Sequence, residues 1–281
     1  MGKQKRSENT YQKINSVFNR DENNIIMPYD GLVNPALEYL RNVKMYATEK
    51  INGTNLRIEV FPVEDRDITA CETPAPLKGV SYTVDFKGKT DNASIPPILF
   101  KHLQKNFPTD RVLAALGLKN YIPVEEFEER RWLKEGIAKA PKYTVYGEGY
   151  GKSVQKCGVR YIKDNAGFIL FDVKVNELYL LPEVAKEIAQ KLGCPYVPEL
   201  EPMSIDEAIE LCKKTFLSKI SEDPTLVAEG VVLKTPVGLL DRSGKRIIVK
   251  VKCEDFAKYY RRYGTFDKVE QHKNPKYQDA E

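Results

Sequence analysis

Histidine and paired cysteine are scarce in this sequence. Its 281 residues include two histidines and five cysteines, and the cysteines stand apart at positions 71, 157, 194, 212 and 253. A structural zinc site needs clustered ligands, and a disulfide framework needs an even set of cysteines. The sequence therefore argues against both kinds of site and predicts reduced thiols.

A long apolar run is also missing. The longest candidates, such as residues 168–171, have the length of a strand, whereas a membrane span needs about 18 apolar residues. The first ten residues, MGKQKRSENT, contain no apolar segment of the kind found in secretory signals. We expect a soluble, cytoplasmic protein with no membrane partner.

Net charge is small, with 44 basic against 40 acidic residues. This balance does not by itself indicate a polyanionic partner. The basic surplus lies at the two ends, since the first twenty residues hold five basic side chains and one acidic, and residues 245–281 hold ten and six. These ends fit either a path for a polyanion or a solvated charged surface.

The pattern of apolar residues predicts strands with a few helices. Residues 45–51 and 55–61 flank Asn52-Gly53, a strong hairpin signal, and the second of these strands has one apolar and one polar face. Further strands are expected at 82–86, 143–148, 167–175, 228–234 and 246–252, and helices at 97–118 with a break at Pro108, 182–192 and 204–220. The predicted class is α+β, with antiparallel sheets flanked by helices.

The tetrapeptide Lys50-Ile-Asn-Gly53 offers a nucleophile beside a turn. A lysine amine attacks phosphorus when it is uncharged, and a nearby glycine allows the close backbone turn that a bound triphosphate requires. One K-x-x-G match in a chain of this composition is no more than chance gives. Taken alone, it fits an exposed lysine at a turn equally well.

Three later segments add charge in a fixed order. Tyr146-Gly-Glu-Gly149 places a carboxylate at the end of a strand, and Glu229 precedes an apolar strand that ends at Lys234. Lys250 and Lys252 are two residues apart in a strand, so their side chains share one face. Each segment alone fits a turn or a solvated strand, but together they indicate a charged site.

This ordered set resembles the covalent nucleotidyltransferase superfamily of polynucleotide ligases and capping enzymes. The wording Glu49-Lys-Ile-Asn-Gly-Thr-Asn55 is most similar to the RNA ligase 2 type. The resemblance implies an ATP-grasp-like α+β nucleotidyltransferase domain at 43–255, preceded by an extension at 1–42 that packs on it. A short basic and aromatic tail is expected at 256–281, and the 29 residues after Lys252 are too few for the downstream OB domain of DNA ligases and capping enzymes.

The resemblance also implies roles for individual residues. Lys50 would become adenylylated, Glu148 would hold the ribose, and Phe171 would stack on adenine, with Phe168 as the second choice. The arginine expected near residue 87 is replaced by Lys87 or Lys89, which lacks the bidentate fork for a 5′-phosphate. The implied catalytic residues are Lys50, Lys250 and Lys252. The implied nucleotide contacts are Glu49, Ile51, Gly53, Asn55, Lys89, Glu148, Phe171, Glu229 and Lys234, and the implied metal ligands are Glu229, Glu148 and Asn55.

The function that follows is an ATP-dependent RNA ligase. It would join 5′-phosphate and 3′-hydroxyl RNA ends through lysyl-AMP and adenylylated RNA, using ATP and Mg²⁺, with Mn²⁺ as an alternative ion. A separate end-healing enzyme is a candidate partner. The alternatives are a DNA ligase, a GTP-dependent capping enzyme, or a non-catalytic nucleic-acid-binding module that uses aromatic residues such as Tyr259, Tyr260, Tyr263 and Phe266.

Overall fold

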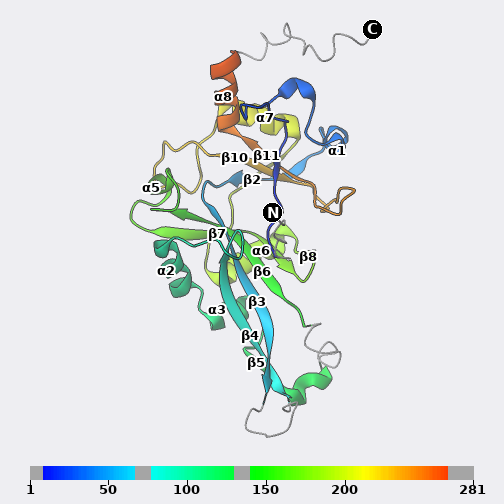
Figure 1. Cartoon of the computed structure of the whole chain (residues 1–281), viewed down its shortest axis with the longest axis vertical. Helices are drawn as coiled ribbons and strands as arrows, with labels where there is room; N and C mark the ends of the chain where they lie inside the picture. The colour runs from blue at the N-terminus through cyan, green and yellow to red at the C-terminus, as the bar shows by residue number, and fades with distance from the viewer. Residues whose placement is uncertain (1–8, 67–76, 130–139, 265–281) are drawn as a thin grey trace, which may run out of the picture. The chain divides into compact units, whose positions relative to one another are not determined.

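The computed structural model describes residues 9–66, 77–129 and 140–264 (Figure 1). These residues form two compact units. Unit 1 takes the described residues up to Tyr11 and those between Asn52 and Val197, and unit 2 takes those between Gln12 and Ile51 and those from Pro198 onward. This division differs from the three predicted segments, so the adenylyltransferase boundaries at 43–255 remain a prediction.

Unit 1 contains an antiparallel sheet covered on one face by helices. The strand order is β5-β4-β3-β6-β7-β8, and apolar residues of the sheet pack with those of α2, α3 and α6. The elements of this unit are β3 (Thr54–Arg66), β4 (Leu77–Gly88), α2 (Pro97–Asn106), α3 (Thr109–Ala115), β5 (Tyr121–Pro123), η2 (Val124–Glu129), β6 (Tyr143–Gly151), α5 (Gly158–Tyr161), β7 (Ala166–Val175), β8 (Leu178–Tyr179) and α6 (Pro182–Leu192).

Unit 2 is built on a second sheet with the order β1-β11-β10-β2-β9. Its pairs are antiparallel except for the parallel pair of β1 and β11. Helices α7 and α8 supply apolar residues to the core on one face. The elements are β1 (Asn15–Ser16), η1 (Pro28–Asp30), α1 (Pro35–Tyr39), β2 (Met45–Lys50), β9 (Glu199–Met203), α7 (Ile205–Lys214), β10 (Gly230–Lys234), β11 (Ile248–Lys252) and α8 (Cys253–Tyr263).

The predicted class, α+β with antiparallel sheets flanked by helices, is confirmed. The predicted helix at 182–192 ends at Gly193, which has a left-handed φ of 69°. Ser204 caps α7 through a capping box with Glu207. That helix ends at Lys214 rather than at residue 220, because Thr215 leaves helical geometry with a φ of 60°.

The predicted hairpin around Asn52-Gly53 is wrong. β2 pairs with β10 and β9, whereas β3 pairs with β4 and β6. The two segments thus enter different sheets, and Gly53 has no positive φ of the kind that a tight type I′ hairpin turn requires. The burial pattern within β3 is confirmed for Leu56, Ile58 and Val60, each at most 1% exposed.

Helix α8 turns an aromatic side toward the core of unit 2. Phe256 and Tyr259 are both 2% exposed and belong to the same apolar cluster. Tyr259 is therefore not available to stack on a base, as a binding module would require. Phe266 lies outside the described residues. Within the part of the chain that the structure describes, no helix has the length and apolar character of a membrane span.

Candidate active site

Three neighbouring strands of unit 2 present lysines on the same face of the sheet. Gly230 of β10 is the register partner of Lys50 in β2 and of Lys252 in β11. Lys250 lies two residues before Lys252, so strand alternation places it on the same face. The buried neighbours Val249 and Val251 point to the core on the opposite face. The predicted shared face of Lys250 and Lys252 follows from this register.

Glu229 connects two of these lysines. Lys50 Nζ donates a hydrogen bond of 2.7 Å to Glu229 Oε2, and Lys252 Nζ lies 2.6 Å from Oε1 of the same carboxylate. Glu229 is held at the start of β10 because its carbonyl accepts a hydrogen bond of 3.0 Å from Cys253 N–H. The proposed nucleophile and a proposed phosphate contact therefore share one counter-ion.

Glycine is required directly after Glu229. Gly230 has a φ of +153°, and a Cβ at this position would lie 2.0 Å from the carbonyl oxygen of Val251. Any larger residue would push β10 away from β11. The Glu-Gly pair thus fixes the acid beside the strand that carries the two lysines.

Lys250 differs from its neighbours in its charge balance. Burial, together with the positive charges of Lys50 and Lys252, lowers the pKa of its amine to about 8. Burial also acts on Lys252, but the hydrogen bond that this amine donates to Glu229, together with the negative charges of Glu229, Asp255 and Glu254, outweighs burial and raises its pKa. Two lysines on one strand face therefore hold their protons with different strength.

The residues beside Lys50 are placed differently. Glu49 is 1% exposed, and its carboxylate accepts hydrogen bonds from Ser218 Oγ at 2.5 Å and from Lys219 N–H at 2.8 Å. Burial raises the pKa of this carboxyl. Ile51 is buried, and its carbonyl lies 3.4 Å from Lys50 Nζ. The structure therefore does not bring the Glu49 side chain together with the lysines.

Lys234 ends β10 on the lysine face. It is paired in register with Tyr46 and Ile248, two positions along the strands from the row of Lys250. Alternation places its side chain on the same face as the lysine cluster. Its predicted nucleotide contact stays a prediction.

Asn55 and Glu148 form a second group, in unit 1. They are direct register partners in β3 and β6, on the face opposite the core residues Leu56 and Leu170. Asn55 Oδ1 is buried and makes no hydrogen bond to any residue that the structure describes. A buried oxygen without a donor is costly unless a ligand satisfies it.

This pair of oxygen-bearing side chains fits a hard cation. Magnesium prefers carboxylate and amide oxygens, usually with several waters retained. Among the described residues, no three His, Cys, Asp or Glu side chains form a metal-binding group. The ion would therefore have few protein ligands, and the open Oδ1 of Asn55 beside Glu148 is the observation that accommodates it.

Gly53 allows the closest backbone approach in this group. A Cβ at this position would lie 2.1 Å from the Gly149 carbonyl oxygen and 2.8 Å from Glu148 Cγ. The chain leaving Lys50 can therefore lie against β6 only if residue 53 is glycine. Glycine serves here for close packing, and not for the hairpin turn that the sequence suggests.

The two candidate phenylalanines of β7 differ in burial and in their aromatic neighbours. Phe168 is 1% exposed and lies 5.4 Å from the Phe107 ring within the core. Phe171 lies at a shift in register between β6 and β7, and its half-buried ring lies 5.0 Å from the ring of Tyr11. The core position of Phe168 removes the second choice, and the stacking role of Phe171 stays a prediction.

Arg57 is a residue whose importance the sequence pattern missed. Alternation in β3 placed it on the polar face, yet the side chain is fully buried. It pairs with Glu59 at 2.5 Å and with Asp91, and it donates a hydrogen bond of 2.7 Å to the Gly88 carbonyl. The acidic residues at positions 59 and 91 were the sequence signal that could have indicated a paired, buried Arg57. Arg57 thereby holds the turn that carries Lys89, whose own side chain is exposed.

A model of the RNA ligase family matches residues 43–252, about three quarters of the chain. The chain belongs to the RNA ligase family. The matched range begins two residues before β2 and ends at Lys252. All the predicted site residues of this RNA ligase family member therefore lie within the match.

Solved structures of an RNA ligase from Naegleria gruberi are similar to this chain. A mutant with ATP and Mn is 15% identical, with a TM-score of 0.46, and the match covers 82% of this chain and 55% of that chain. The structure with PPi is 15% identical, with a TM-score of 0.47 and coverage of 92% and 62%. A mutant with AMP and Mn is 14% identical, with a TM-score of 0.47 and coverage of 91% and 63%. This chain spans less than two thirds of the length of these ligases. None of the curated proteins matches it.

Proposed function

We propose that this chain is an ATP-dependent RNA ligase that becomes adenylylated on Lys50. The observation that carries the proposal is the shared carboxylate of Glu229, which holds Lys50 and Lys252 on one sheet face. This arrangement places a nucleophilic amine beside cations suited to phosphate oxygens. Membership of the RNA ligase family supports RNA as the polynucleotide.

In the first step, the uncharged amine of Lys50 attacks the α-phosphorus of ATP. The N–P bond forms, the bond from phosphorus to the bridging oxygen breaks, and pyrophosphate leaves with the electron pair. The amine must first lose a proton. Glu229 Oε2, at 2.7 Å, is the base within hydrogen-bond reach, and it can pass the proton to solvent.

Lys252 and Lys250 act on the charge that develops at phosphorus. Lys252 shares Glu229 with Lys50, so its ammonium lies near the reacting amine. Lys250 makes no ion pair with any described residue, and an incoming phosphate supplies the anion that it lacks. Preorganised cations of this kind stabilise a transition state without reorganisation cost.

Asn55, Glu148 and Glu229 are the residues that would hold Mg²⁺ or Mn²⁺. When bound, the ion supplies positive charge to the phosphate oxygens. Glu148 is further proposed to hold the ribose, and Phe171 to stack on the adenine. In the later steps, AMP passes to a 5′-phosphate RNA end, and a 3′-hydroxyl displaces it. A separate kinase or phosphatase that prepares these ends is part of the same proposal.

Intact-mass measurement after incubation with ATP and Mg²⁺ tests the first step. The wild-type protein should gain one AMP, Lys50→Ala should gain none, and Lys214→Ala should match the wild type because that exposed lysine lies at the end of α7. GTP in place of ATP should give no adduct. An adduct on Lys50→Ala would exclude this nucleophile, and a GMP adduct would indicate a capping enzyme.

A further inference from the structure

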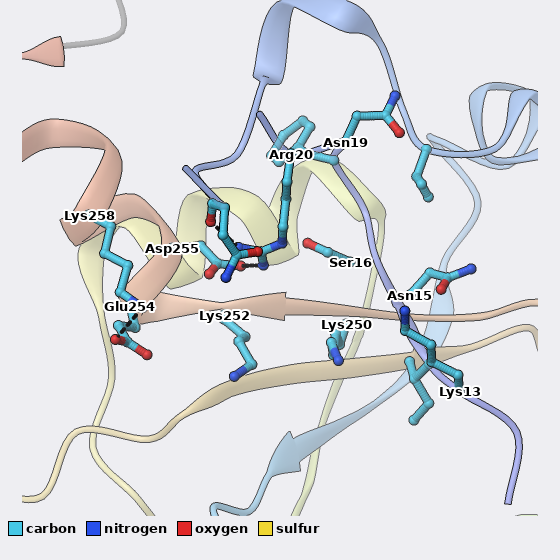
Figure 2. Close-up of a pocket in the computed structure, with 14 residues that line it drawn as sticks. Lys13, Asn15, Ser16, Asn19, Arg20, Lys250, Lys252, Glu254, Asp255 and Lys258 are labelled. Atoms are coloured by element: carbon cyan, nitrogen blue, oxygen red, sulfur yellow. Dashed lines mark hydrogen bonds and ion pairs between the residues drawn. The ribbon is translucent and has the colours of Figure 1, made fainter. Parts of the chain in front are cut away.

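Unit 2 contains a cavity of about 450 Å³ beside the lysine face. One wall is the segment around β1, and the other is β11 with the start of α8 (Figure 2). The two walls are joined by backbone pairing, since Ser16 is the register partner of Lys250 and Val17 N–H donates to the Lys250 carbonyl at 3.2 Å. The sequence pattern of this early segment indicates no particular function.

The lining of the cavity is strongly basic. Lys13, Arg20, Lys250, Lys252 and Lys258 line it, against two acidic residues. Both acids are already neutralised, because Asp255 pairs with Arg20 at 2.5 Å and Glu254 pairs with Lys258 at 2.6 Å. The cavity therefore carries excess positive charge.

The lining lysines differ in their ion pairs. Lys252 is paired with Glu229, but Lys13 and Lys250 form no ion pair with any residue that the structure describes. Figure 2 shows Lys250 and Lys252 projecting from β11 on the same side, and Arg20 turned toward Asp255. Cations left without partners in a polar hollow fit a small, multiply charged anion.

The position of the cavity beside Lys50 indicates which anion it binds. Lys50 and Lys252 contact the two oxygens of one carboxylate, so a cavity-lining ammonium lies within a few ångströms of the nucleophile. The β- and γ-phosphates of ATP are attached to the α-phosphorus that Lys50 attacks, so they would lie within the same short distance of Lys50 as this ammonium. We propose that Lys13 and Ser16, together with Lys250, form a subsite for the β- and γ-phosphates of ATP and for the pyrophosphate that leaves. This inference rests on the proposed function.

The test separates three reactions of the full-length protein. The first is the dependence of AMP-adduct formation on ATP concentration. The second is discharge of the isolated AMP adduct by inorganic pyrophosphate, which needs the subsite for its attacking group. The third is sealing of a pre-adenylylated RNA strand, which involves no triphosphate and no pyrophosphate.

Lys13→Ala should raise the pyrophosphate concentration needed for half-maximal discharge by about tenfold, as expected for one lost charged contact. The KM for ATP should rise similarly, while sealing of pre-adenylylated RNA stays within twofold. Lys13→Arg should retain most of the wild-type behaviour. Lys214→Ala, which removes another exposed lysine outside the cavity, should match the wild type in all three reactions.

Three results would overturn the inference. A Lys13→Ala protein equal to the wild type in all reactions would show that the cavity takes no phosphate. Loss of sealing with unchanged pyrophosphate discharge would assign the cavity to RNA phosphates instead. A wild-type protein that forms no AMP adduct would refute the proposed function itself, and with it this subsite.

Discussion

Lys250 and Lys252 lie two residues apart on one strand face, yet replacing them should change stability in opposite directions. Burial and the charges of Lys50 and Lys252 lower the pKa of Lys250 from 10.5 to about 8. A lysine whose pKa is lower in the folded than in the unfolded chain costs stability wherever it is charged in both states. At pH 7 the wild-type protein therefore pays this cost in full.

The size of the effect follows from the pKa. A fall from 10.5 to about 8 corresponds to an upper limit of about 3–4 kcal/mol. Because Lys250 keeps part of its surface in water, we expect about 1–2 kcal/mol. Lys250→Met keeps most of the unbranched side chain and removes the charge, so it should raise the free energy of unfolding by that amount at pH 7.

Lys252→Met is the matched control. It breaks the 2.6 Å ion pair with Glu229 and should lower the free energy of unfolding by about 1–2 kcal/mol, the value of a charge-assisted hydrogen bond that is partly exposed. Both variants should lose adduct formation with ATP, because both lysines are proposed to contact phosphate. Lys250→Met should therefore gain stability while it loses adduct formation, whereas Lys252→Met should lose both.

Urea unfolding at pH 7 and at pH 9.5 measures these differences. In the wild type, Lys250 loses its proton in the folded state above about pH 8, and the cost fades as the pH approaches 10.5. The advantage of Lys250→Met should therefore shrink at pH 9.5. A Lys250→Met protein that is less stable than the wild type at pH 7, or equally improved at both pH values, would refute the reasoning.

Two further substitutions test the positions around Lys50. Glu49→Ala should lower the free energy of unfolding by about 2–4 kcal/mol because it leaves Ser218 Oγ and Lys219 N–H without their buried acceptor. Glu49→Gln should lower it less. Equal stability of the two variants in urea unfolding would contradict the assigned hydrogen bonds. Gly53→Ala should abolish the AMP adduct and lower the melting temperature, because its Cβ would meet the Gly149 carbonyl at 2.1 Å. Gly117→Ala, with open space around a φ of +69°, should lower the free energy of unfolding by only about 1 kcal/mol and keep the AMP adduct. Similar losses of stability and adduct in the two glycine variants would indicate that glycine flexibility matters at residue 53 rather than close packing.

Local signals predicted local structure well. Gly193 ends α6 and Ser204 caps α7, because capping depends on residues within one helical turn. The break at Pro108 separates α2 from α3 in the same way. The shared face of Lys250 and Lys252 needs only the two-residue period of a strand.

Pairing between distant segments could not be read from the sequence. Asn52-Gly53 has the composition of a hairpin, but β2 pairs with strands about 150 to 190 residues further along the chain. Arg57 follows a polar pattern, and its burial depends on partners distant in sequence, Asp91 and the Gly88 carbonyl, besides the nearby Glu59. Contacts set by tertiary packing override local propensity in both cases.

The segment around β1 shows how a missed pairing hides a site. Residues 1–42 are expected only to form an extension that packs on the core, and β1 within them is only two residues long. Yet its parallel pairing with β11 sets Ser16 opposite Lys250 and brings Lys13 to the same cavity. A strand this short is specified mainly by its partner, so its position depends on the lysine strand that it flanks. If that partner also binds the phosphates, then substitutions in β1 should alter the handling of ATP and pyrophosphate without touching the sealing of an RNA strand that is already adenylylated.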